Sequence, residues 1–142
     1  MSVRQIVVDS NVLVSALRSR RGAAFKLLML IDTGKFESNI SVPLILEYED
    51  ATKRLIGHIA LTARDIDNII DYICAVAHHR TVFYLWRPFL RDPKDDMVLE
   101  LAVSAACDFI VTYNKHDFEG AEQFGIQVVT AQEFLREIGE LP

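Results

Sequence analysis

Short runs of apolar residues alternate along the chain with longer stretches in which apolar positions recur every three or four residues. The short runs are typical of buried strands, and the longer stretches are typical of amphipathic helices. The pattern predicts strands at 6–8, 36–40, 81–85, 108–112 and 126–129, and helices at 12–17, 23–31, 43–56, 63–77, 97–106 and 131–138. Strands that alternate with helices over the whole length predict an α/β fold, with a central parallel sheet covered by helices on both faces.

Two local patterns mark the ends of predicted elements. His78 and His79 follow the fourth predicted helix and are interpreted as its end, and the β-rich run at 81–85 is assigned to a strand. Asp92 followed by Pro93 is typical of a helix N-cap with proline at the first helical position.

The composition is that of a folded, globular chain. Its 142 residues are 51% hydrophobic and include only 6 Gly and 4 Pro, which argues against disorder and suits a single domain over 1–142. Two cysteines, Cys74 and Cys107, are too few for a disulfide scaffold or a Cys zinc cluster, so a reducing cytoplasm is expected. The N-terminus reaches Asp9 after three consecutive apolar residues, so neither a signal peptide nor a membrane association is expected.

Acidic residues stand where predicted strands end. Asp9 directly follows the first strand, and Asp92, Asp95 and Asp96 follow the predicted strand at 81–85. The carboxyl ends of parallel strands are where such sheets bind ligands. Taken alone, Asp9 is equally well explained as a helix N-cap, and acids in the first turn of a helix favour its dipole.

Two more segments bring acids to the same edge. Glu47 lies one turn into the helix that begins near Pro43, and Asp117 lies in the loop after the strand at 108–112. A surface position for Glu47 and a turn position for Asp117 are the simpler explanations of each residue alone. Carboxylates gathered at one edge repel each other unless a divalent cation neutralises them, and all-oxygen ligation suits Mg²⁺ or Mn²⁺.

The segments around these acids resemble the PIN domain family. The resemblance rests on 8–13 (VDSNVL), Glu47 in an apolar helix, 92–96 (DPKDD) before Leu99 and Ala102, and 111–118 (VTYNKHDF). It covers about the whole chain and extends to the VapC-type toxin ribonucleases of bacterial toxin–antitoxin systems. It implies a three-layer α/β/α fold and a metal-dependent endoribonuclease that hydrolyses phosphodiester bonds of RNA, the toxin component of a type II toxin–antitoxin system.

The resemblance also implies a set of site residues. Asp9 corresponds to the first acid, Glu47 to the second, Asp95 or Asp96 to the third and Asp117 to the fourth. The spacing to Leu99, Ala102 and Thr112 favours Asp96, whereas the preceding Asp-Pro-x-Asp favours Asp95. The metal ligands expected from this comparison are Asp9, Glu47, Asp96 and Asp117, and the supporting residues are Ser10, Asn11, Asp92, Thr112 and Asn114.

Contacts with RNA and with proteins are less sharply indicated. The candidate RNA-binding residues are Arg18, Arg20, Arg21, Arg87 and Arg91, although a solvated turn explains the first three equally well. The resemblance implies a cognate antitoxin protein and a homodimer. The apolar helices at 23–31 and 43–56 are candidates for a groove or a dimer face, and core packing explains them at least as well.

Two other functions are compatible with these residues. Many relatives carry Asp where this chain has Asn114, so a catalytically weak or inactive PIN-like interaction module is the main alternative. A phosphate-accepting receiver-like domain also gathers acids at strand ends, but it usually needs an acid pair after the first strand, where this chain has Asp9 alone.

The net charge of −5 disfavours a protein that coats nucleic acid through a broad basic surface. Five of the 20 acids are Asp9, Glu47, Asp95, Asp96 and Asp117, and the remaining 15 equal the 15 Lys and Arg. The excess acidity is therefore what a metal-loaded cleft requires.

Overall fold

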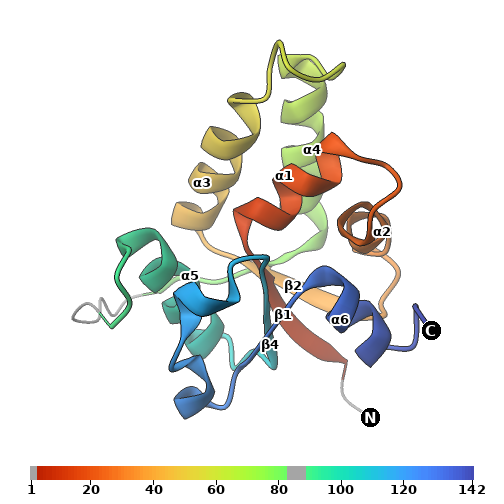
Figure 1. The fold of residues 1–142 in the computed structure, drawn as a ribbon. Coiled ribbons are helices and arrows are strands. Elements are labelled where there is room, and N and C mark those ends of the chain that lie inside the picture. Colours follow the sequence, from red (N-terminus) through yellow and green to blue (C-terminus); the bar gives the residue numbers. More distant parts are fainter. Residues whose placement is uncertain (1–2, 83–88) are drawn as a thin grey trace.

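A five-stranded parallel sheet runs through the centre of the computed structural model, which describes residues 3–82 and 89–142 (Figure 1). The strands, all paired in parallel, are β1 (Arg4–Val8), β2 (Phe36–Ile40), β3 (His78–His79), β4 (Phe109–Val111) and β5 (Gln127–Val129), in the spatial order β3-β2-β1-β4-β5. The helices of the described residues are α1 (Ser10–Arg18), α2 (Ala23–Met29), α3 (Val42–Lys53), α4 (Ala63–Val76), α5 (Pro93–Ser104) and α6 (Ala131–Glu137). The predicted α/β fold with a central parallel sheet is confirmed.

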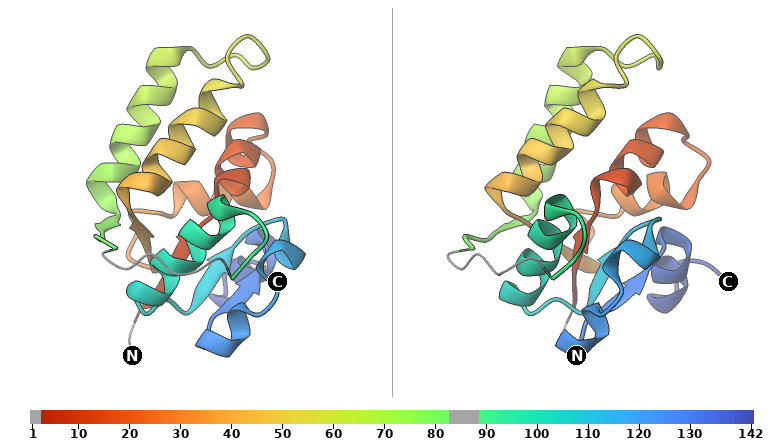
Figure 2. Two further views of the ribbon diagram at one scale, coloured as in Figure 1. Left: turned by 90° about the vertical axis from the view of Figure 1, so that its left-hand side faces the viewer. Right: turned by 60° about the vertical axis from the view of Figure 1, so that its left-hand side comes forward.

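Helices cover both faces of this sheet. On one face, Phe36 of β2 and Phe109 of β4 each contact Phe134 of α6 edge-on, with ring centroids 5.4 Å apart. On the other face, Asn39 of β2 contacts the sulfur of Cys107, just after α5. Figure 2 shows α5 on one side of β1 and α6 on the other. The result is a three-layer α/β/α architecture.

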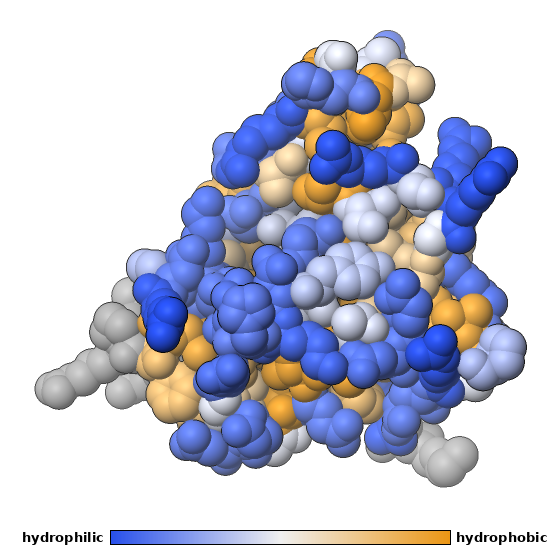
Figure 3. Space-filling model, viewed as in Figure 1, coloured by the Kyte–Doolittle hydropathy of each residue, from blue (hydrophilic) through white to orange (hydrophobic). Residues whose placement is uncertain are grey.

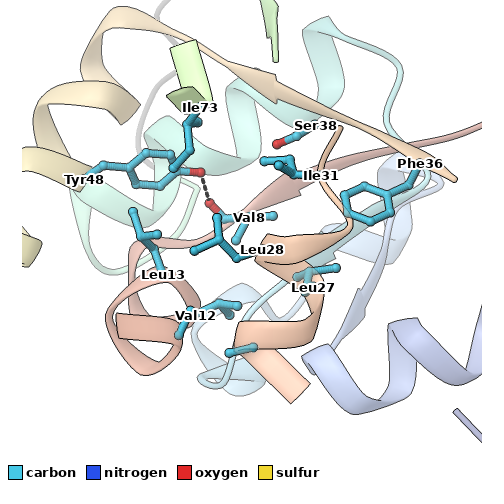
Figure 4. A pocket seen from close by; sticks show the side chains of 12 residues that line it. Val8, Val12, Leu13, Leu27, Leu28, Ile31, Phe36, Ser38, Tyr48 and Ile73 are labelled. Carbon is cyan, nitrogen blue, oxygen red and sulfur yellow. Dashed lines mark hydrogen bonds between the residues drawn. The ribbon is translucent and has the colours of Figure 1, made fainter. Parts of the chain in front are cut away.

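The first face is also packed against α1, α2, α3 and α4. Figure 4 shows the apolar side chains that meet there, around a pocket of only about 20 Å³. The Tyr48 ring is buried among them, and its hydroxyl donates a hydrogen bond of 2.5 Å to the carbonyl oxygen of Val8. This bond ties α3 to the end of β1. Such a small apolar space is part of the core and is no ligand site.

We expect Tyr48→Phe to lower the free energy of unfolding by about 1–2 kcal/mol, because the ring still fills its place but the buried hydrogen bond to Val8 is lost. Urea denaturation followed by circular dichroism measures this change. Tyr72→Phe is the matched control, since Tyr72 is 39% exposed and its loss of a hydroxyl should change stability by less than about 0.5 kcal/mol. Equal stability of the two variants would contradict the tie between Tyr48 and β1.

Several predicted elements begin or end elsewhere. His78 and His79 are not a helix end: α4 stops at Val76, and the two histidines pair with Asn39 and Ile40 as strand β3. The ladder to β2, extended by the bond from the Arg80 amide to the Ile40 carbonyl, outweighs local helical preference. Of the predicted strand at 81–85, Thr81 and Val82 lie outside any strand and 83–85 lie outside the described residues.

The last helices deviate less. The helix predicted to begin at Met97 begins at Pro93, because Asp92 caps it through a bond from the Lys94 amide to its carboxylate. After β4 the chain forms two short 3₁₀ helices, η1 (Lys115–Phe118) and η2 (Ala121–Phe124), which the sequence pattern did not indicate. No helix of the described residues has both the length and the hydrophobicity needed to cross a lipid bilayer.

Candidate active site

The candidate acids come from segments that follow the carboxyl ends of the strands. Asp9 directly follows β1, Glu47 lies on the second turn of α3 just after β2, and Asp117 lies in η1 after β4. Asp95 lies in the first turn of α5. The hydrogen bond from the Asp9 amide to the Val111 carbonyl (2.9 Å) places the ends of β1 and β4 side by side.

Asp9 is held by its surroundings on both carboxylate oxygens. It is 9% exposed and caps α1, where its Oδ1 accepts from the Ser10 amide at 2.8 Å. Its Oδ2 accepts from the Thr112 hydroxyl at 2.9 Å. Asp9 is therefore both a helix N-cap and a candidate site residue. One of its oxygens accepts from the first turn of α1, and the other accepts from Thr112, which directly follows β4.

The Thr112 hydroxyl is the centre of a small network behind Asp9. Besides donating to Asp9, it accepts from the Asn11 side-chain amide at 3.2 Å and from the Asn114 backbone amide at 3.1 Å. The Asn11 Oδ1 in turn accepts from the Tyr113 amide at 3.2 Å. Three of the five expected supporting residues, Asn11, Thr112 and Asn114, thus fix the position of Asp9 through one hydroxyl.

Glu47 lies against Ser10 and Lys94. The Ser10 hydroxyl lies 3.4 Å from the Glu47 Oε1, and the Lys94 ammonium lies 3.6 Å from the Glu47 Oε2. The Glu47 side chain is 16% exposed, whereas that of Lys94 is 59% exposed. Glu47 therefore occupies a half-buried position next to a cation that solvent can reach, and not the open surface position that is usual for glutamate.

The two adjacent acids of α5 face different surroundings. The Asp96 Oδ1 accepts from the backbone amides of Phe89 (3.2 Å) and Leu90 (2.8 Å), and Asp96 is 6% exposed. Asp95 is half-buried and lines a cleft of about 410 Å³ together with Asp92 and Asp117. The structure thus brings Asp95 toward the other candidate acids and uses Asp96 to anchor the segment before α5.

The remaining lining of this cleft is mixed in charge. It comprises Phe89, Leu90, Arg91, His116 and Glu119. The imidazole of His116 lies 3.3 Å from the Asp117 carboxylate and is largely exposed. Arg91 is the one candidate RNA-binding arginine that the described residues place beside the acids.

The carboxylates perturb one another's protonation. Burial raises the pKa of Asp9, and the negative charges of Glu47 and Asp117 raise it further, against the lowering effect of the bonds from Thr112 and Ser10. Burial, followed by the charges of Asp9 and Asp117, raises the pKa of Asp95 to about 7. Burial is the main cause of both shifts and the neighbouring carboxylates add to it, and perturbed carboxylates of this kind are typical of functional sites.

The donor set fits a hard divalent cation. Among residues 3–82 and 89–142, no three Asp, Glu, His or Cys side chains are already arranged to hold a metal ion. The acids that face one another offer only carboxylate oxygens, however, and their mutual repulsion is what a bound cation relieves.

The other candidate arginines lie away from the acids or outside the described residues. Arg18, Arg20 and Arg21 are exposed at the far end of α1, roughly 13 Å along the helix from its start beside Asp9. Arg87 lies outside the described residues. Arg18 and Arg20 instead border a groove of about 440 Å³, whose apolar lining includes Leu17, Phe25, Leu28, Met29, Ile59 and Leu61. Figure 3 shows apolar surface over the loop between α3 and α4, which forms one wall of this groove.

Two residues of the site region had no assigned role in the sequence interpretation. Lys94 lies within the motif at 92–96, but nothing along the chain indicates that its side chain, on α5, meets Glu47 of α3. Tyr48 belongs to an apolar helical stripe, and its hydroxyl bonds to Val8, the residue before Asp9. In the sequence, only its position next to Glu47 indicates that Tyr48 lies near the acids.

We expect Asp96→Ala to lower the free energy of unfolding by about 2–3 kcal/mol, because two backbone amides lose a buried, charged acceptor. Asp96→Asn keeps an acceptor oxygen of the same shape and should recover most of this loss. Thermal denaturation in the presence of EDTA measures both variants without any metal contribution. An Asp96→Ala protein as stable as the wild type would show that the two amide bonds do not matter.

Comparison with known proteins agrees with this geometry. The family model of the PIN domain matches residues 5–116, which include every candidate acid except Asp117. No curated protein matches the chain. PIN domains are generally nucleases, and they typically use divalent metal ions. Because the match spans well over half of the chain and agrees with the α/β/α architecture, this protein is a member of the PIN domain family.

Proposed function

We propose that the protein is a metal-dependent endoribonuclease, the toxin component of a type II toxin–antitoxin system. The observation that carries this proposal is the convergence of Asp9, Glu47, Asp95 and Asp117 at one edge of the sheet, where burial and mutual repulsion raise the pKa of Asp9 and Asp95. An arrangement that is unfavourable in the metal-free protein is expected where a cation is part of the working state.

In this proposal Asp9, Asp95 and Asp117 hold the metal, and Glu47 completes the site or orients the attacking water. Mg²⁺ and Mn²⁺ both suit an all-oxygen set. A bound divalent cation lowers the pKa of a water molecule and stabilises the oxygen that leaves when the P–O bond breaks. We assign the third acid to Asp95 because the Asp96 carboxylate is engaged by the amides of Phe89 and Leu90.

The chain's own groups prepare this chemistry before any ligand binds. Thr112 orients the Asp9 carboxylate, and Asn11 and the Asn114 amide orient Thr112. Such support raises the fraction of time that a ligand spends in the productive geometry. Arg91, exposed at the cleft, is positioned to contact a phosphate of the substrate.

The decisive experiment compares cleavage of a single-stranded RNA in Mn²⁺, in Mg²⁺ and in EDTA, with a DNA strand of the same sequence beside it. We expect cleavage of RNA with either metal and none in EDTA. Equal cleavage in EDTA would refute the metal mechanism, and preferential cleavage of DNA would refute the assignment to RNA.

The alternative is a PIN-like interaction module with a weak or inactive site. It is favoured by Asn114, which contributes its backbone amide to the Thr112 network and is exposed. Calorimetric titration with Mn²⁺ separates the two functions, because an inactive site of this kind should bind no metal.

The groove bordered by Arg18 and Arg20 is the surface we propose for the antitoxin. An apolar segment with acidic residues would match its lining of leucine, isoleucine and phenylalanine and its two guanidinium groups. A homodimer through α2 or α3 is part of the same proposal. Co-purification of the chain with the product of a neighbouring small gene tests the antitoxin. Light scattering of the chain alone tests the homodimer.

A further inference from the structure

A second hollow includes the candidate acid Glu47 in its lining and does not include Arg91. It has a volume of about 380 Å³ and lies between the first turns of α3 and α5, where it is lined by Pro43, Leu46, Glu47, Pro93, Lys94 and Met97. Its volume falls within the range of pockets that hold small organic groups. Figure 1 shows these two helices beginning side by side.

The lining of this hollow combines apolar side chains with one exposed cation. Leu46 is 59% exposed although it is a large aliphatic residue, and Met97 is half-buried beside it. Lys94 stands at the edge, 3.6 Å from Glu47, and its side chain is 59% exposed. A pair at this distance and exposure is weak, so Lys94 is free to turn toward another anion.

The hollow shares a residue with the candidate active site. Glu47 lines the hollow, and its negative charge contributes to the raised pKa of Asp9. Asp92 and Asp95, one and two residues from Pro93, line the cleft that contains Arg91. Candidate acids therefore line two hollows, and the lining of each also includes a basic side chain.

We propose that the hollow is a nucleotide subsite, in which a base next to the cleaved bond packs on Leu46 and Met97 and Lys94 binds the phosphate of that nucleotide. The inference rests on the proposed ribonuclease function. Unpaired bases of single-stranded RNA offer apolar faces to such side chains, and the thioether of a methionine contacts aromatic rings favourably. The positive charge of Lys94 complements the negative charge of the phosphate. Because Glu47 lines the hollow and is also a candidate acid, a nucleotide bound there lies next to the candidate active site.

Steady-state cleavage of a short single-stranded RNA at saturating Mn²⁺ tests the subsite. For Leu46→Ala we expect KM to rise about fivefold with kcat nearly unchanged, because packing of a neighbouring base contributes to binding before and during the reaction alike. For Lys94→Gln we expect KM to rise and the slope of log KM against log salt to fall by about 0.7, the loss of one phosphate contact on a single strand.

Matched variants control for charge and for apolar area. Val42→Ala shortens another exposed aliphatic residue of α3, one that does not line this hollow, and Lys53→Gln removes a cation paired with Asp67 at the end of α3. Both should leave KM within a factor of two. Mn²⁺ affinity, measured by calorimetry, should be the same in Leu46→Ala as in the wild type, which separates the subsite from the metal site.

The outcomes distinguish this inference from the function on which it rests. A wild-type protein that neither binds Mn²⁺ nor cleaves RNA would refute the proposed function. Normal cleavage by the wild type with unchanged KM in Leu46→Ala and Lys94→Gln would refute the subsite alone. A change of oligomeric state in Leu46→Ala, seen by light scattering with KM per site unaltered, would assign the hollow to contact between two copies of the chain and would overturn the subsite.

Discussion

Asp9→Asn should reduce the rate of RNA cleavage roughly 1,000-fold, which corresponds to about 4 kcal/mol of lost transition-state stabilisation. The Asp9 carboxylate interacts with the other candidate acids. The charges of Glu47 and Asp117 contribute to its raised pKa, and its own charge contributes to the raised pKa of Asp95. Asparagine has the same shape but no charge, so a divalent cation loses its most buried anionic partner. Multiple-turnover cleavage at saturating Mn²⁺ measures the effect.

Stability measurements separate this loss from unfolding. Since burial raises the pKa of Asp9, its ionised form is unfavourable in the metal-free protein. The thermal midpoint of Asp9→Asn in EDTA at pH 8 should therefore equal or exceed that of the wild type. Glu49→Gln is the matched control, since it removes an acid two residues from Glu47 and should retain full activity. Wild-type cleavage rates in Asp9→Asn would refute the assignment of the site.

The parallel sheet and most helices were predictable because local and global preferences agree in them. The run of Ile6 and Val7 is fully buried in β1, and Thr62 and Thr130 cap α4 and α6 through paired bonds with the acids three residues later. Strand β3 was missed because its two histidines carry no hydrophobic pattern. Their pairing with β2 is a property of the assembled sheet, and local periodicity does not contain it.

The site was predictable to the level of segments but not of individual contacts. Strand ends indicate where acids gather, yet neighbouring residues of a helix point about 100° apart, so Asp95 and Asp96 face different directions. Spacing along the chain supported either one. The amides of Phe89 and Leu90 distinguish them, and these amides lie before the helix in a turn that no motif describes. The contact of Lys94 with Glu47 likewise depends on how α3 meets α5.

The net charge of −5 gains a physical meaning from this arrangement. The acids in excess of the basic residues are the five candidate acids, and four of them face the same edge of the sheet. Their repulsion is partly offset within the chain, by Lys94 at Glu47 and by the helix cap at Asp9. Burial, together with the charges of Asp9 and Asp117, nevertheless raises the pKa of Asp95, and the metal-free protein should therefore be sensitive to pH.

Asp95→Asn should reduce RNA cleavage roughly 100-fold and, in the absence of metal, make the protein more stable at pH 8. The pKa of Asp95 is raised from 3.8 to about 7, so between these values the folded state holds a proton that the unfolded state has released. The free energy of unfolding then falls as the pH rises through this window, and the full loss persists above pH 7. Asparagine is neutral at every pH and removes this loss.

The size of the gain follows from the partial exposure of Asp95. Solvent screens a half-exposed carboxylate, so we expect about 1 kcal/mol at pH 8, which raises the thermal midpoint by about 3–5 °C. At pH 3, below both pKa values, the variant and the wild type should melt together, since Asp95 is then largely protonated in both states of the wild type. Asp71→Asn, at an exposed position of α4, is the control and should shift neither midpoint.

Adding Mn²⁺ at pH 8 should reverse the order of stability of the wild type and Asp95→Asn, because the wild type gains stability from binding and the variant gains less. A variant that is less stable than the wild type at pH 8 in EDTA, or that keeps full activity, would contradict the role of Asp95 as the acid whose charge the metal offsets.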